Sequence, residues 1–202
     1  MSSDALADYV SLDPESGLWD RVFTVAPLVL VGTVEPSGKI DLAPKHMVTP
    51  MGWGPSFGFV CTPRHSTYEN AEREGTFTVS YLAPDQVVLS GLTAGPRCED
   101  DTKPVVDALD TFEASNGRDA FVRGGYLYLE CRTHSLTDGF GVNSLIVGEI
   151  IAAYADEKAL RISDGDDREV IEQFPLLVYL APGRWSEIRS SLSFPFPAGF
   201  ER

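Results

Sequence analysis

Short apolar and β-branched runs, separated by turn signals, recur along this chain. Residues 27–34 read PLVLVGTV, and residues 35–38 (EPSG), which follow, are typical of a turn. Similar runs predict strands at residues 40–43, 57–61, 76–81, 126–132, 145–154 and 176–180. Because strands are many and long helical patterns are few, the sequence favours a mainly β fold, a closed or nearly closed antiparallel barrel with a few peripheral helices.

Two helices are expected between these strands. Ser66 and Glu69 have the spacing of a capping box, which predicts a helix with Ser66 as its N-cap. Gly75 is expected to end this helix in the left-handed conformation. A second helix is expected to start at Pro84, because proline suits a first turn and Asp85 suits the positive end of the helix dipole.

Length and composition agree with one globular domain. The chain has 202 residues, of which 43% are hydrophobic and 23% are charged, and this is enough for a buried core. We expect one domain over residues 1–202, with its core at roughly 20–190 and an extension at each end. The 16 basic and 30 acidic residues give a net charge of −14. Such a charge repels phosphate backbones and anionic lipids, which argues against nucleic acid or a membrane as a partner.

The cysteines and the first residues bear on the compartment. Cys61, Cys98 and Cys131 are too few and too far apart for a disulfide framework or a zinc site. Isolated cysteines are typical of a reducing compartment. The N-terminal residues are polar and acidic and do not have the pattern of a secretory signal. We therefore expect a cytoplasmic protein without a metal site.

One stretch departs from the acidic character of the chain. Residues 43–68 contain no Asp or Glu, whereas about four would be expected in a window of this length. The same stretch carries Lys45, His46, Arg64 and His65. Either chance produced this locally positive stretch or it binds an anion.

Residues around the start of the first predicted helix suit a phosphate. Arg64 offers a guanidinium, Ser66 and Thr67 offer hydroxyls, and the first N–H groups of a helix are unpaired at its positive end. Asn70, one turn later, lies on the same side and adds a donor. The alternative is that Ser66 only caps the helix and Arg64 is a solvated surface charge.

Other candidate motifs fail on their context. Residues 54–58 (GPSFG) match GxSxG, but the serine precedes a strand instead of a helix, and no GxGxxG or GxxxxGK[ST] motif occurs. His134 has no partner at the spacing of metal ligands, and a cysteine such as Cys61 is more commonly a buried inert thiol. The acidic segment 164–167 lacks the ligand spacing of an EF-hand loop, so we expect a solvated loop there instead of a calcium site.

Five segments in a fixed order carry a family resemblance. They are PLVLVGTVEPSGKIDLAPKHMVTP, CTPRHSTYENAEREGTFTVSYL, YLYLECR, LIVGEI and PLLVYLAPGRW, and they extend over residues 27–188. Together they resemble the flavin reductase-like, FMN-binding split-barrel family. This resemblance implies a Greek-key split barrel that forms a homodimer, with FMN in a groove at the subunit interface.

The same resemblance assigns residues to the flavin. It implies that residues 45–49 lie along the isoalloxazine ring and the ribityl chain, and that residues 62–70 receive the phosphate, in agreement with the anion site inferred above. Backbone N–H groups of residues 47–49 would stabilise negative charge on the reduced ring. The cofactor-binding residues implied in this way are Lys45, His46, Met47, Val48, Thr49, Cys61, Thr62, Arg64, Ser66, Thr67 and Asn70.

Two positions depart from the family pattern. His46 stands where the family often has a small hydroxyl residue, and its imidazole either contacts the phosphate or ribityl chain or crowds them. Asn143 stands where many reductases have a histidine that helps to receive the nicotinamide. The amide of Asn143 can form a hydrogen bond, but it cannot carry a proton or a positive charge.

The resemblance implies a flavoprotein oxidoreductase, an NAD(P)H-dependent flavin reductase in which hydride passes from NAD(P)H to flavin N5. Asn143 is then a candidate contact of the nicotinamide. Two alternatives stay open. One is a non-enzymatic FMN-binding electron carrier, and the other is a split-barrel protein that uses another ligand, such as pyridoxal phosphate or haem, or has lost its cofactor.

Overall fold

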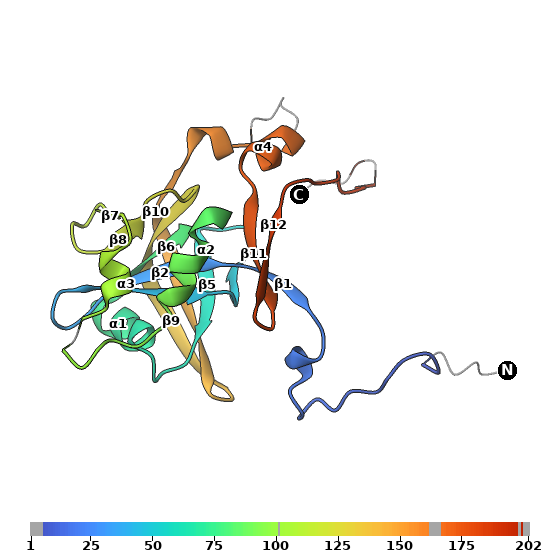
Figure 1. Ribbon diagram of the computed structural model, residues 1–202, viewed down its shortest axis with the longest axis horizontal. Coiled ribbons are helices and arrows are strands. Elements are labelled where there is room, and N and C mark those ends of the chain that lie inside the picture. Colours follow the sequence, from blue (N-terminus) through green and yellow to red (C-terminus); the bar gives the residue numbers. More distant parts are fainter. Residues whose placement is uncertain (1–5, 101, 162–166, 198, 200–202) are drawn as a thin grey trace.

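The structure, a computed structural model, describes residues 6–100, 102–161, 167–197 and 199. Its main element is a seven-stranded antiparallel sheet (Figure 1). The strands of this sheet, in spatial order, are β3 (Ile40–Lys45), β2 (Val29–Val34), β6 (Thr76–Tyr81), β9 (Leu127–Phe140), β10 (Asn143–Ala155), β5 (Ser56–Cys61) and β4 (Val48–Pro50).

Smaller elements surround this sheet. A three-stranded sheet stands beside it in Figure 1, with the order β1 (Thr24–Pro27), β11 (Leu176–Ala181) and β12 (Arg184–Ile188), and β7 (Thr111–Glu113) pairs with β8 (Ala120–Val122). The helices are η1 (Leu18–Asp20), α1 (Ser66–Glu74), η2 (Pro84–Gln86), α2 (Val87–Leu92), α3 (Pro104–Asp107), η3 (Glu157–Ala159) and α4 (Asp167–Gln173). Within the described ranges, no helix has the length and apolar character needed to cross a membrane.

The large sheet curls, so that the end of one edge strand lies near the start of the other. β3 is one edge strand and β4 is the other, yet only His46 and Met47 separate them along the chain. Three Cα–Cα steps span at most about 11 Å, so the end of β3 and the start of β4 must lie close together. The sheet is therefore a half-barrel, and the mainly β, nearly closed antiparallel fold predicted from the sequence is confirmed.

β2 is buried along its whole length because its two faces belong to two cores. Successive residues of a strand point to opposite faces. Val29 and Val31 pack inside the half-barrel, whereas Leu30 packs on the other side. The inner core also contains Phe57, Phe59, Phe77, Val79 and Ile146, and the outer core contains Leu42, Leu82, Val106, Val122 and Leu177.

The structure corrects the predicted strands at three places. Residues 27–34 do not form one strand, because the chain leaves the three-stranded sheet at Pro27, which has no N–H to donate, and enters the half-barrel at Val29. The strand predicted at residues 176–180 is confirmed as β11, but it joins that separate sheet instead of the barrel. β9 continues to Phe140 through a polar stretch that has no apolar alternation, so its second half was not predicted.

α1 begins at Ser66, but the predicted capping box is wrong. His65 is the N-cap, with an extended φ of −98° and ψ of 139°, and no side chain caps the helix. The N–H of His65 donates to the carbonyl of Thr62 at 3.0 Å, and this turn leads directly into the helix. Ser66 is therefore already the first helical residue, and the N-cap lies one residue earlier than predicted. The left-handed cap at Gly75 (φ 68°) and the helical start at Pro84 are confirmed. Of the acidic segment 164–167, residues 164–166 lie outside the described residues.

Candidate functional site

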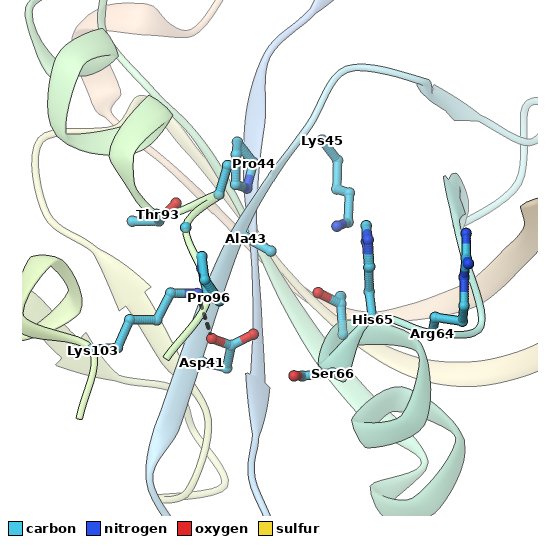
Figure 2. A pocket seen from close by; sticks show the side chains of 13 residues that line it. Asp41, Ala43, Pro44, Lys45, Arg64, His65, Ser66, Thr93, Pro96 and Lys103 are labelled. Carbon is cyan, nitrogen blue, oxygen red and sulfur yellow. Dashed lines mark hydrogen bonds and ion pairs between the residues drawn. The ribbon is translucent and has the colours of Figure 1, made fainter. Parts of the chain in front are cut away.

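A cavity of about 440 Å³ opens at the N-terminus of α1, and we call it the anion cavity (Figure 2). Strand β3, the start of α1, the segment that follows α2 and the residue before α3 form its wall. Its lining residues are Asp41, Ala43, Pro44, Lys45, Arg64, His65, Ser66, Thr67, Thr93, Ala94, Gly95, Pro96 and Lys103.

The backbone N–H groups of Ser66 and Thr67 have no acceptor in the described part of the chain. The first hydrogen bonds of α1 are donated by the N–H groups of Tyr68 and Glu69, to the carbonyl of His65, at 2.9 and 3.4 Å. The two earlier N–H groups lie at the positive end of the helix dipole and belong to residues that line the cavity. An anion in the cavity would satisfy them.

Lys45 and Arg64 bring two positive charges to the same place. In the described part of the chain, no carboxylate forms an ion pair with either side chain. Figure 2 shows Lys45 pointing from β3 toward His65 at the start of α1. Burial lowers the pKa of Lys45, an effect that the neighbouring Cys61 and Asp41 partly oppose. A buried cation is unfavourable unless an anion accompanies it, so a ligand phosphate would stabilise this arrangement.

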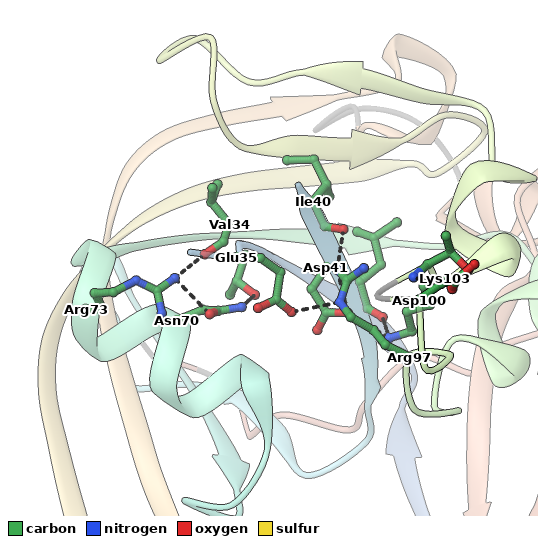
Figure 3. A network of polar contacts seen from close by, with 12 residues as sticks. Val34, Glu35, Ile40, Asp41, Asn70, Arg73, Arg97, Asp100 and Lys103 are labelled. Carbon is green, nitrogen blue, oxygen red and sulfur yellow. Dashed lines mark hydrogen bonds and ion pairs between the residues drawn. The ribbon is translucent and has the colours of Figure 1, made fainter. Parts of the chain in front are cut away.

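Of the described residues that line the cavity, Asp41 is the only carboxylate, and other cations already neutralise it. Lys103 Nζ lies 2.7 Å from Asp41 Oδ1 and donates to the carbonyl of Leu42 at 3.1 Å. Arg97 Nη2 lies 4.0 Å from the same carboxylate and continues the network to Glu35 (Figure 3). The anion cavity therefore keeps a net positive charge inside an acidic protein.

The two histidines near the cavity are neutral at neutral pH. Burial lowers the pKa of His65, and the charges of Lys45 and Arg64 lower it further. Burial and Lys45 lower the pKa of His46 in the same way. His46 does not line the anion cavity, and its ring stacks on Tyr179, with ring centroids 4.3 Å apart and planes tilted by 33°.

The structure brings four of the predicted residues to this cavity: Lys45, Arg64, Ser66 and Thr67. The other predicted residues do not line it. Along β4, Met47 and Thr49 are exposed, whereas Val48 is buried in the half-barrel core.

Of the remaining candidates, Cys61 and Asn70 are buried, and Thr62 and Asn143 are partly buried. Burial raises the pKa of the Cys61 thiol, and the hydroxyl of Thr62 is buried without a hydrogen-bond partner in the described ranges. Asn70 donates through Nδ2 to Thr33 Oγ1 at 3.1 Å and accepts from Arg73 at 2.9 Å, so its amide joins α1 to β2 (Figure 3). Asn143 begins β10, where the next residue pairs with Cys61, and it does not line the cavity.

Sequence reasoning missed Lys103 and residues 93–96. Lys103 directly precedes Pro104, the first residue of α3, and residues 93–96 follow the end of α2. No local pattern connects these positions to Asp41 or Arg64, because only the folded chain brings them together. Lys103 is 62 positions from its partner Asp41 and lies outside the acid-free stretch, so the charge pattern along the sequence did not indicate it.

The sequence signature of the flavin reductase like domain matches residues 22–179. The chain belongs to this family. The family predicted from the sequence is thereby confirmed, and membership supports a flavin-related oxidoreductase function. No curated protein matches the chain.

Solved structures share the fold over nearly the whole chain. A Shewanella frigidimarina NCIMB 400 protein, assigned as a flavin reductase with a split barrel domain, is 17% identical with a TM-score of 0.76, covering 93% of this chain and 95% of that one. Flavoredoxin from Methanosarcina acetivorans is 21% identical with a TM-score of 0.75, covering 96% of this chain and 98% of that one. An FMN-binding protein from Thermus thermophilus with bound 1-cyclohex-2-enone is 18% identical with a TM-score of 0.70, covering 92% of this chain and 98% of that one. These similarities establish the split-barrel fold.

Proposed function

We propose that this protein binds FMN, with the phosphate in the anion cavity, and acts as an NAD(P)H-dependent flavin reductase. One observation carries the proposal: the unpaired N–H groups of Ser66 and Thr67 converge with Lys45 and Arg64 on a cavity whose single carboxylate is already neutralised. Such a donor set fits a phosphate dianion. Membership of the flavin reductase family and the likeness to an FMN-binding protein support the choice of ligand.

The residues of the cavity have different roles in this proposal. Arg64 presents a planar fork that suits two phosphate oxygens, and Lys45 supplies a point charge. The N–H groups of Ser66 and Thr67 fix the phosphate at the end of α1. β4 is an edge strand, and the alternating hydrogen bonds to β5 leave the N–H of Val48 pointing away from that strand, which supports the assignment of residues 47–49 to the polar edge of the ring.

Bound FMN supplies the hydride chemistry, and the chain supplies binding, orientation and electrostatics. The positive cavity holds the negative tail of the cofactor and fixes where its ring lies along the connection from β3 to β4. His65 stays neutral beside this site, so it can accept or donate one hydrogen bond without adding charge.

A homodimer with the flavin between subunits is part of the proposal. The exposed apolar side chains around β4 support it: Met47 is 49% exposed, Met51 is 40% exposed and Trp53 is 92% exposed. Large apolar side chains gathered at a sheet edge are typical of an interaction surface. Analytical ultracentrifugation of the FMN-loaded protein tests this, and a monomer at micromolar concentration contradicts it.

Anaerobic titration tests the proposed function directly. The purified protein is titrated with FMN and, in parallel, with riboflavin, which lacks the phosphate. We expect FMN to bind much more tightly than riboflavin, and NADH or NADPH to remove the visible absorbance of the bound flavin. Absence of FMN binding would refute the proposal.

A non-enzymatic electron carrier is the second candidate, and Asn143 favours it. An amide at the start of β10 cannot carry the proton or charge that a histidine would. A carrier would bind FMN tightly but oxidise NADH and NADPH only slowly. The variant Asn143→His separates the two functions, because a large gain in nicotinamide oxidation would show that the native residue limits this step.

A further inference from the structure

A second cavity, of about 580 Å³, lies between α2 and the β11–β12 hairpin, and we call it the apolar cavity. Val88 and Leu92 of α2 form one side of it, and Tyr179 and Trp185 form the other. It shares Pro44 and Ala94 with the anion cavity, so the two cavities adjoin. Its volume falls within the range typical of small-molecule sites.

Among the described residues that line the apolar cavity, Arg184 is the only one that carries a charge at neutral pH. In the described part of the chain, no carboxylate lines this cavity and Arg184 forms no ion pair. His46, the other basic residue in the wall, is neutral at neutral pH because burial lowers its pKa. In a protein with a net charge of −14, a cavity with a lone arginine and no acid selects for an anionic ligand.

The wall of the apolar cavity is held in place by specific contacts. The ring of His46 stacks on Tyr179, which fastens the end of β3 to β11. The hydroxyl of Tyr179 accepts a hydrogen bond from the N–H of Gly183 at 2.7 Å, which fixes the turn that carries Arg184 and Trp185. Trp185 is 50% exposed, so the free protein leaves an aromatic face open to a ligand. Stacking on such a face suits a flat ring.

We propose that the apolar cavity binds a small aromatic carboxylate, with its ring against Trp185 and Leu92 and its carboxylate on the guanidinium of Arg184. Arginine recognises carboxylates through two parallel hydrogen bonds. The apolar cavity adjoins the anion cavity at Pro44 and Ala94, which makes it a candidate substrate site for the bound flavin. That assignment rests on the proposed function. Binding itself does not depend on that assignment.

Calorimetry on the FMN-loaded protein tests the proposal with 2-naphthoate and its neutral isostere 2-naphthamide. We expect 2-naphthoate to bind at least about tenfold more tightly, because a charge-assisted hydrogen bond is lost in the amide. In Arg184→Gln this preference should largely disappear. The matched control is Arg189→Gln, because Arg189 pairs with Glu187 at 2.6 Å and does not line the cavity.

A second variant fills the cavity without disturbing the fold. A Cβ at Gly91 of α2 meets no atom within 4 Å, so Gly91→Leu has room for its side chain. We expect this variant to lose 2-naphthoate binding and to keep FMN binding. Equal binding of the acid and the amide to the native protein would overturn the proposal, as would loss of FMN binding in Gly91→Leu, because the flavin ring itself would then occupy the cavity.

The same measurements separate the two proposals. If the native protein binds 2-naphthoate through Arg184 but does not bind FMN, the aromatic carboxylate site stands and the proposed function fails. If it binds FMN but not 2-naphthoate, the proposed function stands and the further inference fails. A dimer that dissociates in Gly91→Leu, with no 2-naphthoate binding to the native protein, would show that a second copy covers the cavity and would also overturn it.

Discussion

The side chains of Lys45 and His46, neighbours at the end of β3, line two different cavities. Lys45 lines the anion cavity, and His46 lines the apolar cavity, where it stacks on Tyr179. Successive residues of an extended chain point to opposite sides, which explains the division. One short segment therefore places a cation beside the proposed phosphate and an uncharged imidazole beside the proposed substrate.

Removal of the Arg64 guanidinium should weaken FMN binding and leave riboflavin binding unchanged. Arg64 lines the anion cavity, and no carboxylate in the described part of the chain pairs with it. Loss of one charge-assisted contact costs about 1.5–3 kcal/mol, or a factor of roughly 10–100 in the dissociation constant. Fluorescence titration of Arg64→Ala measures both ligands at moderate salt.

Arg161→Ala is the matched control for this titration. Arg161 is an exposed arginine that pairs with Asp167 at 2.7 Å and does not line the anion cavity. Its removal should change neither dissociation constant. An unchanged FMN affinity in Arg64→Ala, or an equal loss for riboflavin, would place the phosphate elsewhere.

Lys45→Met should stabilise the free protein while it weakens FMN binding. Burial lowers the pKa of Lys45, so the folded state holds its charge at a cost when no ligand is present. Replacement by an apolar side chain of similar length should raise the free energy of unfolding by about 0.5–2 kcal/mol. Thermal unfolding of the two proteins without flavin measures the first effect, and FMN titration measures the second.

The stability gained by Lys45→Met should depend on pH. A lysine with a lowered pKa binds fewer protons when folded than when unfolded, so its contribution to stability rises with pH between the lowered pKa and 10.5. The stability difference between Lys45→Met and the native protein should therefore shrink as the pH rises through that window. FMN affinity of the native protein should fall over the same window, because the cation is lost. A difference that grows with pH would show that the charged lysine is stabilised in the free protein.

The sequence predicted the strands whose residues are buried on both faces or alternate regularly. β2 is a nearly continuous apolar run, β6 alternates apolar residues with threonine and serine, and β5 alternates large apolar residues with small ones, so the local pattern was sufficient to predict these strands. It did not predict the second half of β9, whose polar residues 133–140 form a strand only because they pair with β10. It also missed β4 and β12, which are short or exposed.

The candidate site divides in the same way. Lys45, Arg64, Ser66 and Thr67 lie within one acid-free stretch, so their charge pattern was visible along the chain. Residue type alone could not show that Asn70 is used inside the fold, because its partner is 37 positions away. The apolar cavity was not predicted, because its walls come from α2 and the β11–β12 hairpin, and nothing in either segment alone indicates the other.

Asp41→Asn should destabilise the protein without weakening FMN binding to the folded state. The carboxylate is buried against Lys103 at 2.7 Å, and its loss leaves a buried ammonium without its counter-charge. Breaking one partner of a buried pair costs about 3–5 kcal/mol. Urea unfolding measures the stability, and FMN titration at low temperature measures binding.

The control for Asp41→Asn is Glu187→Gln, which breaks the more exposed pair with Arg189. This change should cost less than about 1 kcal/mol. Removal of a negative charge from the cavity wall should favour an anion. Loss of FMN affinity in folded Asp41→Asn would therefore contradict the view that Asp41 pairs with Lys103 and Arg97 and does not contact the ligand.

Two glycines should respond in opposite directions to the same substitution. A Cβ on Gly32 of β2 would collide with the hydroxyl of Thr78 and would lie 2.7 Å from the carbonyl oxygen of Ala120, a backbone atom that cannot move aside easily. Gly32→Ala should therefore destabilise the fold by about 1–3 kcal/mol. A Cβ on Gly91 of α2 meets nothing within 4 Å, so Gly91→Ala should stabilise it by up to about 1 kcal/mol through helix propensity. Urea unfolding measures the change in the free energy of unfolding for each variant. Stabilisation by Gly32→Ala would show that β2 and β8 pack less closely than they do in the structure.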